Sequence, residues 1–408
     1  MDSSPASSTR REPAGAHGRL RRALLWSGAG IALLFLVFHL AGGWYFSSQI
    51  GRRALSTEFR RDSNTPDYNT RVLALAGGTV TLTGPDDERL NRNGVFGVRW
   101  EGGWGVLGAI SGRTPDGAVT REFTHQAGTG LAPGTLVSVG SQVYPEDPLI
   151  GRGIPFEEVD IAGEGGMYPA WFVPGRGSTW FVFVHGNGMA RSDALRILPA
   201  IAGAGLPVLV PSYRGDPGAP DAPDGRLTYG KREWRDLEAA VQYALDNGAQ
   251  SVVLEGMSMG GAVVMAFLLE SPLAAAVSAV VFDAPLLDFE RTVEFQAGNE
   301  TIPLLGLPLP GTLVETAQWL AARRFGVDWA YTRYLDRARE LRQPILLIHG
   351  TEDEDVPIAT SEELARLRPD LVREFYAVPG AGHVEAWNVN AAEYERRVLA
   401  FIAANSGK

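Results

Sequence analysis

The pattern of hydrophobic and polar positions divides the chain into three parts with different periodicities. Near the N-terminus, residues 23–46 are almost continuously apolar, and only Ser27 and His39 interrupt them. Over residues 69–150, short β-prone runs recur between turn signals. Over residues 151–408, apolar strand patterns alternate with segments of helical periodicity. These differences predict a transmembrane helix, a small β-rich module and an α/β domain, in that order.

The apolar N-terminal segment is long enough to cross a lipid bilayer, which takes about 20 residues of helix. Arginines flank it on both sides, and Trp26 near one end and Trp44-Tyr45 near the other suit the two lipid–water interfaces. A cleaved signal peptide is the alternative, but His39 stands before Ala41 where a cleavage site needs a small residue. We therefore expect an uncleaved single-pass anchor.

Polar segments lie on either side of this anchor. Residues 1–22 are rich in Ser, Pro and Arg and are expected to be disordered, and residues 47–68 are expected to form a charged stalk. The balance of arginines is nearly even. It favours a tail inside the cell, with the larger C-terminal part outside the cell membrane.

The predicted β-rich module contains six strand-like runs, at 72–75, 79–83, 95–100, 104–107, 119–123 and 136–139. Glu101-Gly-Gly103 between two of them predicts a hairpin. Trp100 and Trp104 flank this hairpin. They form either a binding surface or part of a core, and strand aromatics more often pack in cores. The sequence of this module indicates no function.

In the C-terminal part, the alternation of strands and helices favours parallel βαβ units. Strands are predicted at 156–161, 167–173, 180–185 and 208–210, and helices near 191–203 and 228–247. The alternation lapses between about 285 and 340, where an amphipathic helix is expected at Thr312–Phe325. This segment follows a strand that ends at Asp283, so it is predicted to be a lid. Its apolar residues either suit an acyl chain or pack on the body of the domain; they are Leu304, Leu305, Leu307, Leu309, Trp319 and Leu320.

Composition narrows the range of functions. The chain has 408 residues, 45% of them hydrophobic, which is ample for one large core and a smaller one. The net charge of −10 argues against nucleic acid as the main partner, and the absence of cysteine excludes disulfides and a thiolate nucleophile. No cluster of His, Asp and Glu has the spacing of metal ligands, and no glycine-rich phosphate loop is present. We therefore expect neither a metal nor a cofactor.

The stretch Gly256-Met-Ser258-Met-Gly260 is the best candidate for chemistry. It follows a buried-strand pattern at 250–255 and precedes an apolar helical run at 261–269. A sharp turn from strand to helix exposes the serine hydroxyl above the sheet, where a substrate carbonyl can reach it. The pentapeptide alone is weak evidence for a nucleophile, but its position between a predicted strand and a predicted helix makes Ser258 a candidate.

A serine nucleophile needs a base, and one of the six histidines is well placed. The other five lie in the N-terminal tail, the apolar segment, the β-rich module or at strand ends; they are His17, His39, His125, His185 and His349. His383 lies in a glycine-rich loop after the strand pattern 372–378. Because it follows Ser258 in the chain, as this architecture requires, we expect it to act as the general base.

The third group should be an acid between the serine and the histidine. Asp353 follows the strand pattern 345–349 and would hold the imidazole in the required tautomer. Asp355 and Asp283 are the alternatives.

An oxyanion hole is the remaining requirement, and it usually carries a large share of catalysis. The backbone N–H of Met259 is one expected donor, because it stands at the positive end of the predicted helix. The second should come from the loop His185-Gly-Asn-Gly188, where Asn187 is favoured and Gly188 is the alternative.

Five motifs together carry a family resemblance: His185-Gly-Asn-Gly188, Tyr213-Arg-Gly215, Gly256-Met-Ser-Met-Gly-Gly261, His349-Gly-Thr-Glu-Asp353 and Gly380-Ala-Gly-His383. They resemble the alpha/beta-hydrolase superfamily, most closely its serine aminopeptidase-like and abhydrolase-domain branch, over about residues 155–405. The resemblance implies a mostly parallel eight-stranded sheet with helices on both faces. It also implies hydrolysis of an ester, thioester or amide by Ser258, Asp353 and His383.

The predicted function is that of a membrane-anchored serine hydrolase, acting on a carboxylic ester, a thioester or a lipid-like acyl substrate through an acyl-enzyme. A serine aminopeptidase-like activity is one alternative, and it would need an acidic or polar site for the substrate amine. A catalytically inert binding or scaffold protein is the other, since a fold does not by itself give a function.

Overall fold

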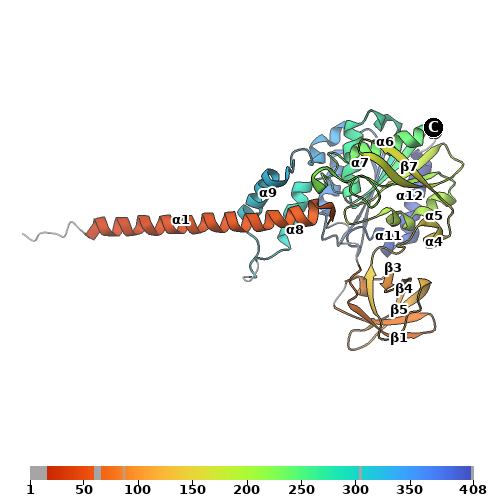
Figure 1. Ribbon diagram of the computed structural model, residues 1–408, viewed down its shortest axis with the longest axis horizontal. Helices are drawn as coiled ribbons and strands as arrows, with labels where there is room; N and C mark the ends of the chain where they lie inside the picture. Colours follow the sequence, from red (N-terminus) through yellow and green to blue (C-terminus); the bar gives the residue numbers. More distant parts are fainter. Residues whose placement is uncertain (1–15, 59–65, 86–87, 303–305, 406–408) are drawn as a thin grey trace, which may run out of the picture.

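The computed structural model describes residues 16–58, 66–85, 88–302 and 306–405, which form three parts. A long N-terminal helix projects from a large α/β domain, and a small barrel lies beside that domain (Figure 1). The predicted α/β sheet and the β-rich module that precedes it are both confirmed.

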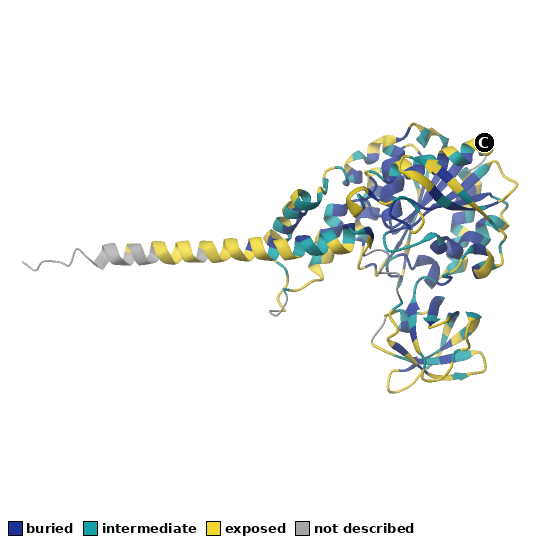
Figure 2. Cartoon of the chain, in the orientation of Figure 1, coloured by how far each residue is buried: buried dark blue, intermediate teal, exposed yellow. Residues whose placement is uncertain are grey.

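The N-terminal helix α1 (Ala16–Gln49) continues as a π-helical turn, η1 (Ile50–Leu55). At 1.5 Å per residue, α1 is about 50 Å long, which exceeds the roughly 30 Å hydrocarbon core of a bilayer. The helix over Leu25–Leu55 contains an apolar stretch long enough to be a membrane span, although a signal sequence has the same properties. The projecting part of the helix is coloured as exposed in Figure 2, and its exposed side chains are mainly large and apolar, among them Trp26 and Leu34.

The boundaries of this helix differ from the predicted ones. Residues 16–22 are helical and not disordered, and residues 47–55 continue the helix where a stalk was expected. Residues 1–15 and 59–65 lie outside the described part of the chain. No proline interrupts the chain from Ala16 to Leu55, and the C-terminal part of the helix packs against another helix, which stabilises it.

The small module is a closed six-stranded antiparallel barrel, in the order β1-β2-β5-β4-β3-β6. Its elements are β1 (Thr70–Ala76), β2 (Thr79–Thr83), α3 (Glu88–Asn91), β3 (Phe96–Trp100), β4 (Gly103–Arg113), β5 (Val119–Gly128) and β6 (Leu136–Gly140). The expected hairpin joins β3 to β4. Trp100 packs in the barrel core, and Trp104 packs in a core cluster of the α/β domain. Neither tryptophan is on the surface, because both rings are needed to fill apolar cores.

The α/β domain contains one eight-stranded sheet, in the order β14-β13-β12-β11-β9-β10-β8-β7. Its strands are β7 (Glu157–Gly163), β8 (Gly166–Val173), β9 (Thr179–Val184), β10 (Val208–Pro211), β11 (Ser251–Met257), β12 (Val277–Asp283), β13 (Ile345–Gly350) and β14 (Val372–Val378). The pairs from β10 through β9 to β14 are parallel, and β8 is antiparallel to both β7 and β10. The carboxyl ends of the central strands therefore meet at one edge.

Helices cover both faces of this sheet because successive strand residues point to opposite sides. Val182 and Val184 belong to one core cluster, and Phe181 and Phe183 belong to the other. One face carries α6 (Trp234–Asp246), α7 (Met259–Glu270) and α10 (Ile358–Leu367). The other carries α5 (Leu198–Gly203), α11 (Ala386–Val389) and α12 (Ala391–Asn405), with α4 (Pro148–Arg152) nearby.

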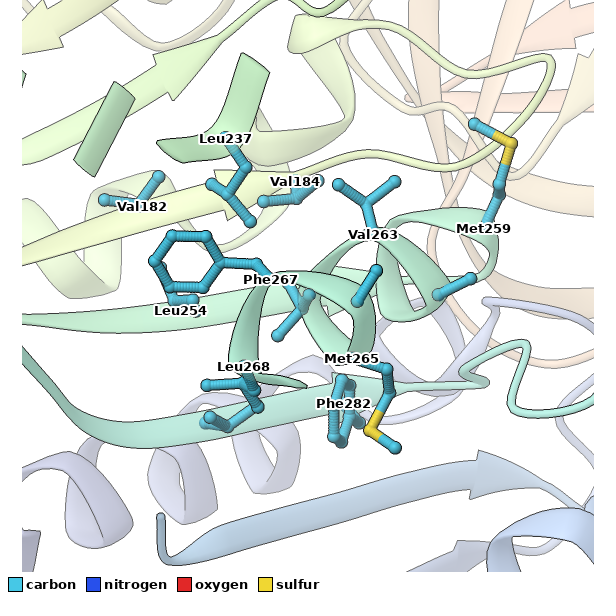
Figure 3. Close-up of a cluster of buried hydrophobic side chains, with 14 of the residues drawn as sticks. Val182, Val184, Leu237, Leu254, Met259, Val263, Met265, Phe267, Leu268 and Phe282 are labelled. Atoms are coloured by element: carbon cyan, nitrogen blue, oxygen red, sulfur yellow. The ribbon is translucent and has the colours of Figure 1, made fainter. Parts of the chain in front are cut away.

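Helix α7 is buried almost completely. Figure 3 shows Val263 and Phe267 of this helix packed among side chains of the central strands and of α6. A helix that is apolar all round has no face for solvent, so its first residue is held firmly at the edge of the sheet.

Two helix boundaries differ from the predicted ones for local reasons. The helix expected near 191–203 is divided into a 3-10 turn, η2 (Arg191–Arg196), and the short α5. The helix expected at 228–247 begins only at Trp234. The Glu233 carboxylate accepts hydrogen bonds from the N–H groups of Thr228 and Gly230, and this fixes a turn in place of the first helical residues.

The predicted lid contains α8 (Phe289–Gly298) and α9 (Gly311–Phe325), and α9 packs along α1. The two helices approach closely: a Cβ at Gly43 would lie 2.7 Å from the Thr316 methyl group. Leu307 and Trp319 are exposed, whereas Leu304 and Leu305 lie outside the described residues. The lid therefore packs partly on the N-terminal helix. The sequence alone indicated only an acyl chain or the body of the domain as its partner.

Candidate active site

Ser258 occupies the sharp turn between β11 and α7. Its φ of 54° and ψ of −121° are strained for a residue with a side chain. The turn is held by hydrogen bonds from the Ser258 N–H to the Asp283 carbonyl (3.0 Å) and from the Gly261 N–H to the Ser258 carbonyl (2.9 Å). A Cβ at Gly260 would lie closer than 3.0 Å to the Val184 carbonyl oxygen, so the turn requires glycine there.

The structure brings together the three side chains that the sequence singled out. His383 Nε2 is 2.8 Å from Ser258 Oγ, and His383 Nδ1 is 2.7 Å from Asp353 Oδ2. The serine follows β11, the aspartate follows β13, and the histidine follows β14. Because these parallel strands end at the same edge of the sheet, residues up to 125 positions apart become neighbours.

The electrostatics of this group suit a general base. Burial opposes the charged form of Asp353, but His383 and His349 outweigh it and hold the pKa of Asp353 well below its usual range. Burial likewise favours neutral His383, but the charge of Asp353 and the hydrogen bond to it raise the pKa of His383 above its ordinary value. An ionised aspartate thus makes the imidazole a stronger proton acceptor.

Asp353 is positioned by more than the histidine. Its Oδ1 accepts the backbone N–H groups of Asp355 (2.9 Å) and Val356 (2.8 Å). Its Oδ2 is also 3.2 Å from Nε2 of the buried His349, which occupies a strand end as expected. Of the alternative acids, Asp355 is one of these supporting residues, and Asp283 is buried in a separate cluster.

A second cluster of buried acids lies near the carboxyl ends of β11 and β12, close to Ser258. Glu255 and Asp283 are completely buried on neighbouring strands, and the Tyr394 hydroxyl lies 3.0 Å from Glu255 Oε1 and 3.1 Å from Asp283 Oδ2. Burial, followed by the charge of Asp283, raises the pKa of Glu255 to about 8. Burial also raises the pKa of Asp283. The Tyr394 hydroxyl has one hydrogen, so it can donate to only one of the two acids. If it donates to Asp283, the contact with Glu255 is still a hydrogen bond when Glu255 is protonated and donates to the Tyr394 oxygen.

Sequence reasoning missed this cluster. The sequence did contain one indication of it. Glu255 is the only charged residue in an otherwise apolar strand pattern, and a charged residue in a buried strand requires a partner or protonation.

Arg196 is a further buried residue that links the loops of the site. Its guanidinium donates to the Val384 carbonyl (2.8 Å) and to Asn388 Oδ1 (2.9 Å), just after His383. It also lies 3.0 Å from the sulfur of Met257, which immediately precedes the serine. The turn that carries Ser258 and the loop that carries His383 are thus held by one side chain.

The histidine loop also contacts the barrel. Glu385 is buried and forms ion pairs with Arg89 (2.6 Å) and Arg92 of the barrel. The Asn388 side-chain amide donates to the Val95 carbonyl at 2.7 Å. The barrel therefore packs against the loop that carries His383.

Of the three residues expected to supply oxyanion donors, two line the pocket of Ser258 and one does not. Met259 is the first residue of α7, so its N–H has no acceptor within the helix, and it lines the same pocket as Ser258. Asn187 lines that pocket too, whereas Gly188 lines a separate polar pocket beside the barrel. This arrangement favours Asn187 over Gly188.

The pocket above Ser258 has a volume of about 500 Å³. The sequence did not predict one of its walls, which is the end of the N-terminal helix. The Ala54 carbonyl accepts hydrogen bonds from the Asn187 side chain (3.1 Å) and from the Tyr229 hydroxyl (3.0 Å). Arg53 and Ala54 both line the pocket. A site in the C-terminal domain is therefore completed by the N-terminal helix.

The remaining histidines with described side chains have structural contacts. His185 is buried against Asp216, at 2.9 Å. His39 donates or accepts a hydrogen bond with Thr312 Oγ1 of the lid at 2.9 Å, and His125 contacts the Thr129 carbonyl in the barrel. Within the described residues, no group of three or more His, Asp or Glu side chains could hold a metal ion.

Comparisons with known proteins agree with this architecture. Residues 181–397 match the model of the alpha/beta hydrolase family, and residues 71–140 match a domain of unknown function. An uncharacterised protein of Mycobacterium tuberculosis is 28% identical over 240 residues, which are 57% of this chain and 72% of that protein. The uncharacterised protein YfhR of Salmonella typhimurium is 23% identical over 290 residues, which are 65% of this chain and 88% of that protein.

Among solved structures, the Pyrococcus furiosus esterase Pf2001 is similar, with a TM-score of 0.51 and 19% identity. The superposition covers 65% of this chain and 98% of the esterase. At this identity the likeness concerns the fold alone. Because the family match spans more than half of the chain, the protein belongs to the alpha/beta hydrolase family.

Proposed function

We propose that the protein is a membrane-anchored serine hydrolase that cleaves a carboxylic ester, a thioester or a lipid-like acyl substrate. The observation that carries this proposal is the position of the His383 ring, which bridges Ser258 Oγ at 2.8 Å and Asp353 Oδ2 at 2.7 Å. Serine, base and acid are thereby in hydrogen-bond contact in the order that proton transfer needs.

In this mechanism Ser258 Oγ attacks the substrate carbonyl carbon while His383 Nε2 accepts the serine proton. Asp353 stays ionised and stabilises the imidazolium. The N–H groups of Met259 and Asn187 bind the oxyanion. His383 then protonates the leaving group, and an acyl-enzyme forms. Water, deprotonated by His383, releases the acid and restores the serine.

The packing of the N-terminal helix supports an anchor over a signal peptide. Its C-terminal end supplies a wall of the pocket, and Arg324 of the lid donates to the Trp44 carbonyl (3.0 Å) and to Ser47 Oγ (2.6 Å). Removal of this helix would leave these groups without their partners. An anchored protein stays with the membrane fraction after an alkaline wash, and complete release by that wash would contradict this part of the proposal.

Labelling with a fluorophosphonate probe tests the nucleophile. The probe should label the wild-type protein and a Ser111→Ala control, in which an exposed barrel serine is changed, and should not label Ser258→Ala. Labelling that persists in Ser258→Ala refutes the assignment. Hydrolysis should be lost in the same variant.

A peptidase with aminopeptidase-like specificity is the second candidate, and one observation favours it. The carboxylates of Glu300, Glu354 and Asp355 line the pocket, where they could bind a substrate ammonium group. A panel of activated esters of graded chain length, one thioester and one aminoacyl amide separates the two candidates. Preferred cleavage of the amide, reduced by Glu354→Gln, would favour the peptidase.

A further inference from the structure

A second pocket lies between the N-terminal helix and the lid, next to the pocket above Ser258. One face of the helix supplies Tyr45, Phe46, Gln49, Ile50 and Arg53, which have the spacing of neighbours on a helical surface. The opposite wall comes from α8 and α9, with Val293, Ala297, Val314 and Ala317, and from the described residue Leu309, which precedes α9. These lining side chains are mostly apolar, so the pocket suits a hydrocarbon group.

The two pockets are adjacent and share part of their walls. Arg53, Ala54, Gln296 and Glu300 line both of them. At this border Arg53 Nη1 is 3.5 Å from Glu300 Oε1, and both side chains are more than half exposed. An exposed ion pair contributes little to stability and moves readily, so it is no barrier to a chain that passes from one pocket to the other.

The position of the apolar pocket along the helix places it at the edge of a membrane. A span of about 20 residues that starts with the apolar run at residue 23 ends near Gly42, and the pocket begins three residues later, at Tyr45. The Arg324 guanidinium lies 3.6 Å from the centre of the Trp44 ring. Tryptophan and arginine are typical of the lipid–water interface. Trp319 of α9 and Leu307, which precedes α9, are exposed apolar residues of the lid.

The size of the pocket indicates how a chain would lie in it. Its volume is about 160 Å³. An apolar cavity of about 150 Å³ accommodates benzene, so this one holds roughly six carbons. A longer acyl chain must extend out of the pocket, and its apolar end would then reach the bilayer that surrounds α1.

From these observations we propose that the pocket binds the acyl chain of an ester lipid that enters sideways from the bilayer. The membrane helix forms one wall of the entry path, and the ester carbonyl reaches Ser258 beyond the Arg53–Glu300 pair. This inference rests on the proposed serine hydrolase activity and narrows its substrate class to membrane-resident acyl lipids. The N-terminal helix is then part of substrate binding as well as an anchor.

A photoreactive inhibitor tests this path in the full-length protein held in phospholipid vesicles. The probe is a long-chain alkyl fluorophosphonate with a diazirine on about its sixth carbon. It should attach to Ser258 and, after illumination, crosslink to residues 45–53, 293–297 or 309–317. Attachment to Ser258 with crosslinks confined to other segments overturns the inference. No attachment to Ser258 rejects the proposed function instead, so the two failures are distinct.

A pair of variants on α8 provides a second test. Ala297→Trp places a large ring in the pocket, whereas Glu294→Trp places the same ring on an exposed position of the same helix, outside both pockets. The measured quantity is kcat/KM for a dodecanoyl ester divided by kcat/KM for the acetyl ester. We expect this ratio to fall about tenfold or more in Ala297→Trp, and to stay at the wild-type value in Glu294→Trp. Equal ratios in the two variants contradict an acyl-binding role for the pocket.

Discussion

Replacing Glu255 by glutamine should make the stability of the protein less dependent on pH. Gln keeps the size of the side chain and a hydrogen-bond partner for Tyr394, but it cannot ionise. In the folded protein, burial and the charge of Asp283 raise the pKa of Glu255 to about 8, whereas its ordinary value is 4.5. Between these two values the folded protein holds a proton that the unfolded chain has released.

The sign and size of the effect follow from this difference. The stability contributed by protonated Glu255 is fully present below pH 4.5 and is lost as the pH rises towards the folded-state pKa of about 8. A difference of one bound proton changes the free energy of unfolding by about 1.4 kcal/mol per pH unit. Between about pH 5 and pH 8 the wild type therefore loses roughly 3 kcal/mol relative to Glu255→Gln.

Urea unfolding of both proteins in the same detergent, at several pH values, measures this difference. Other titrating groups are common to both proteins and largely cancel. An exposed control, Glu294→Gln, should give a constant difference from wild type over the same range. Parallel curves for wild type and Glu255→Gln would refute the conclusion that folding keeps this carboxyl protonated.

Three further predictions concern the group of Ser258, Asp353 and His383 and the turn that carries the serine. Because the pKa of His383 is raised by Asp353, kcat/KM should increase with pH through a midpoint above 6.5, and a midpoint at or below that value would contradict the geometry. Asp353→Asn should lower kcat by about 10³- to 10⁴-fold while the protein remains folded, as measured by ester hydrolysis and circular dichroism. Gly260→Ala should lower the free energy of unfolding by about 3 kcal/mol, because the new methyl group collides with the Val184 carbonyl; unchanged thermal unfolding would show that the turn can move aside.

Much of the fold could be predicted because its signals are local. The central strands are short apolar runs, and the barrel strands alternate between turn signals, so periodicity identifies both. Chain order then placed Ser258, Asp353 and His383 at the ends of parallel strands, and the structure brings them into contact. Their catalytic roles remain predictions.

The parts that were missed depend on contacts between distant segments. No local pattern shows that Glu255 faces Asp283 on the next strand, or that Ala54 reaches the loop of Asn187, 133 positions away. The stalk was expected because residues 47–68 are polar and charged. The helix persists to Leu55 because α9 packs against it, and that partner is more than 250 positions away in the sequence.

The buried carboxylate of Glu385 has a consequence for how the protein can be divided. Its two cationic partners, Arg89 and Arg92, come from the barrel, and it stands two residues after His383. Cutting the chain to the hydrolase domain alone would remove both ion-pair partners and expose this carboxylate to water, so the loop that carries His383 would lose the contacts that hold it against the barrel. In an isolated hydrolase domain the loop of His383 would thus be less firmly held, and a lack of activity there would say little about the intact protein.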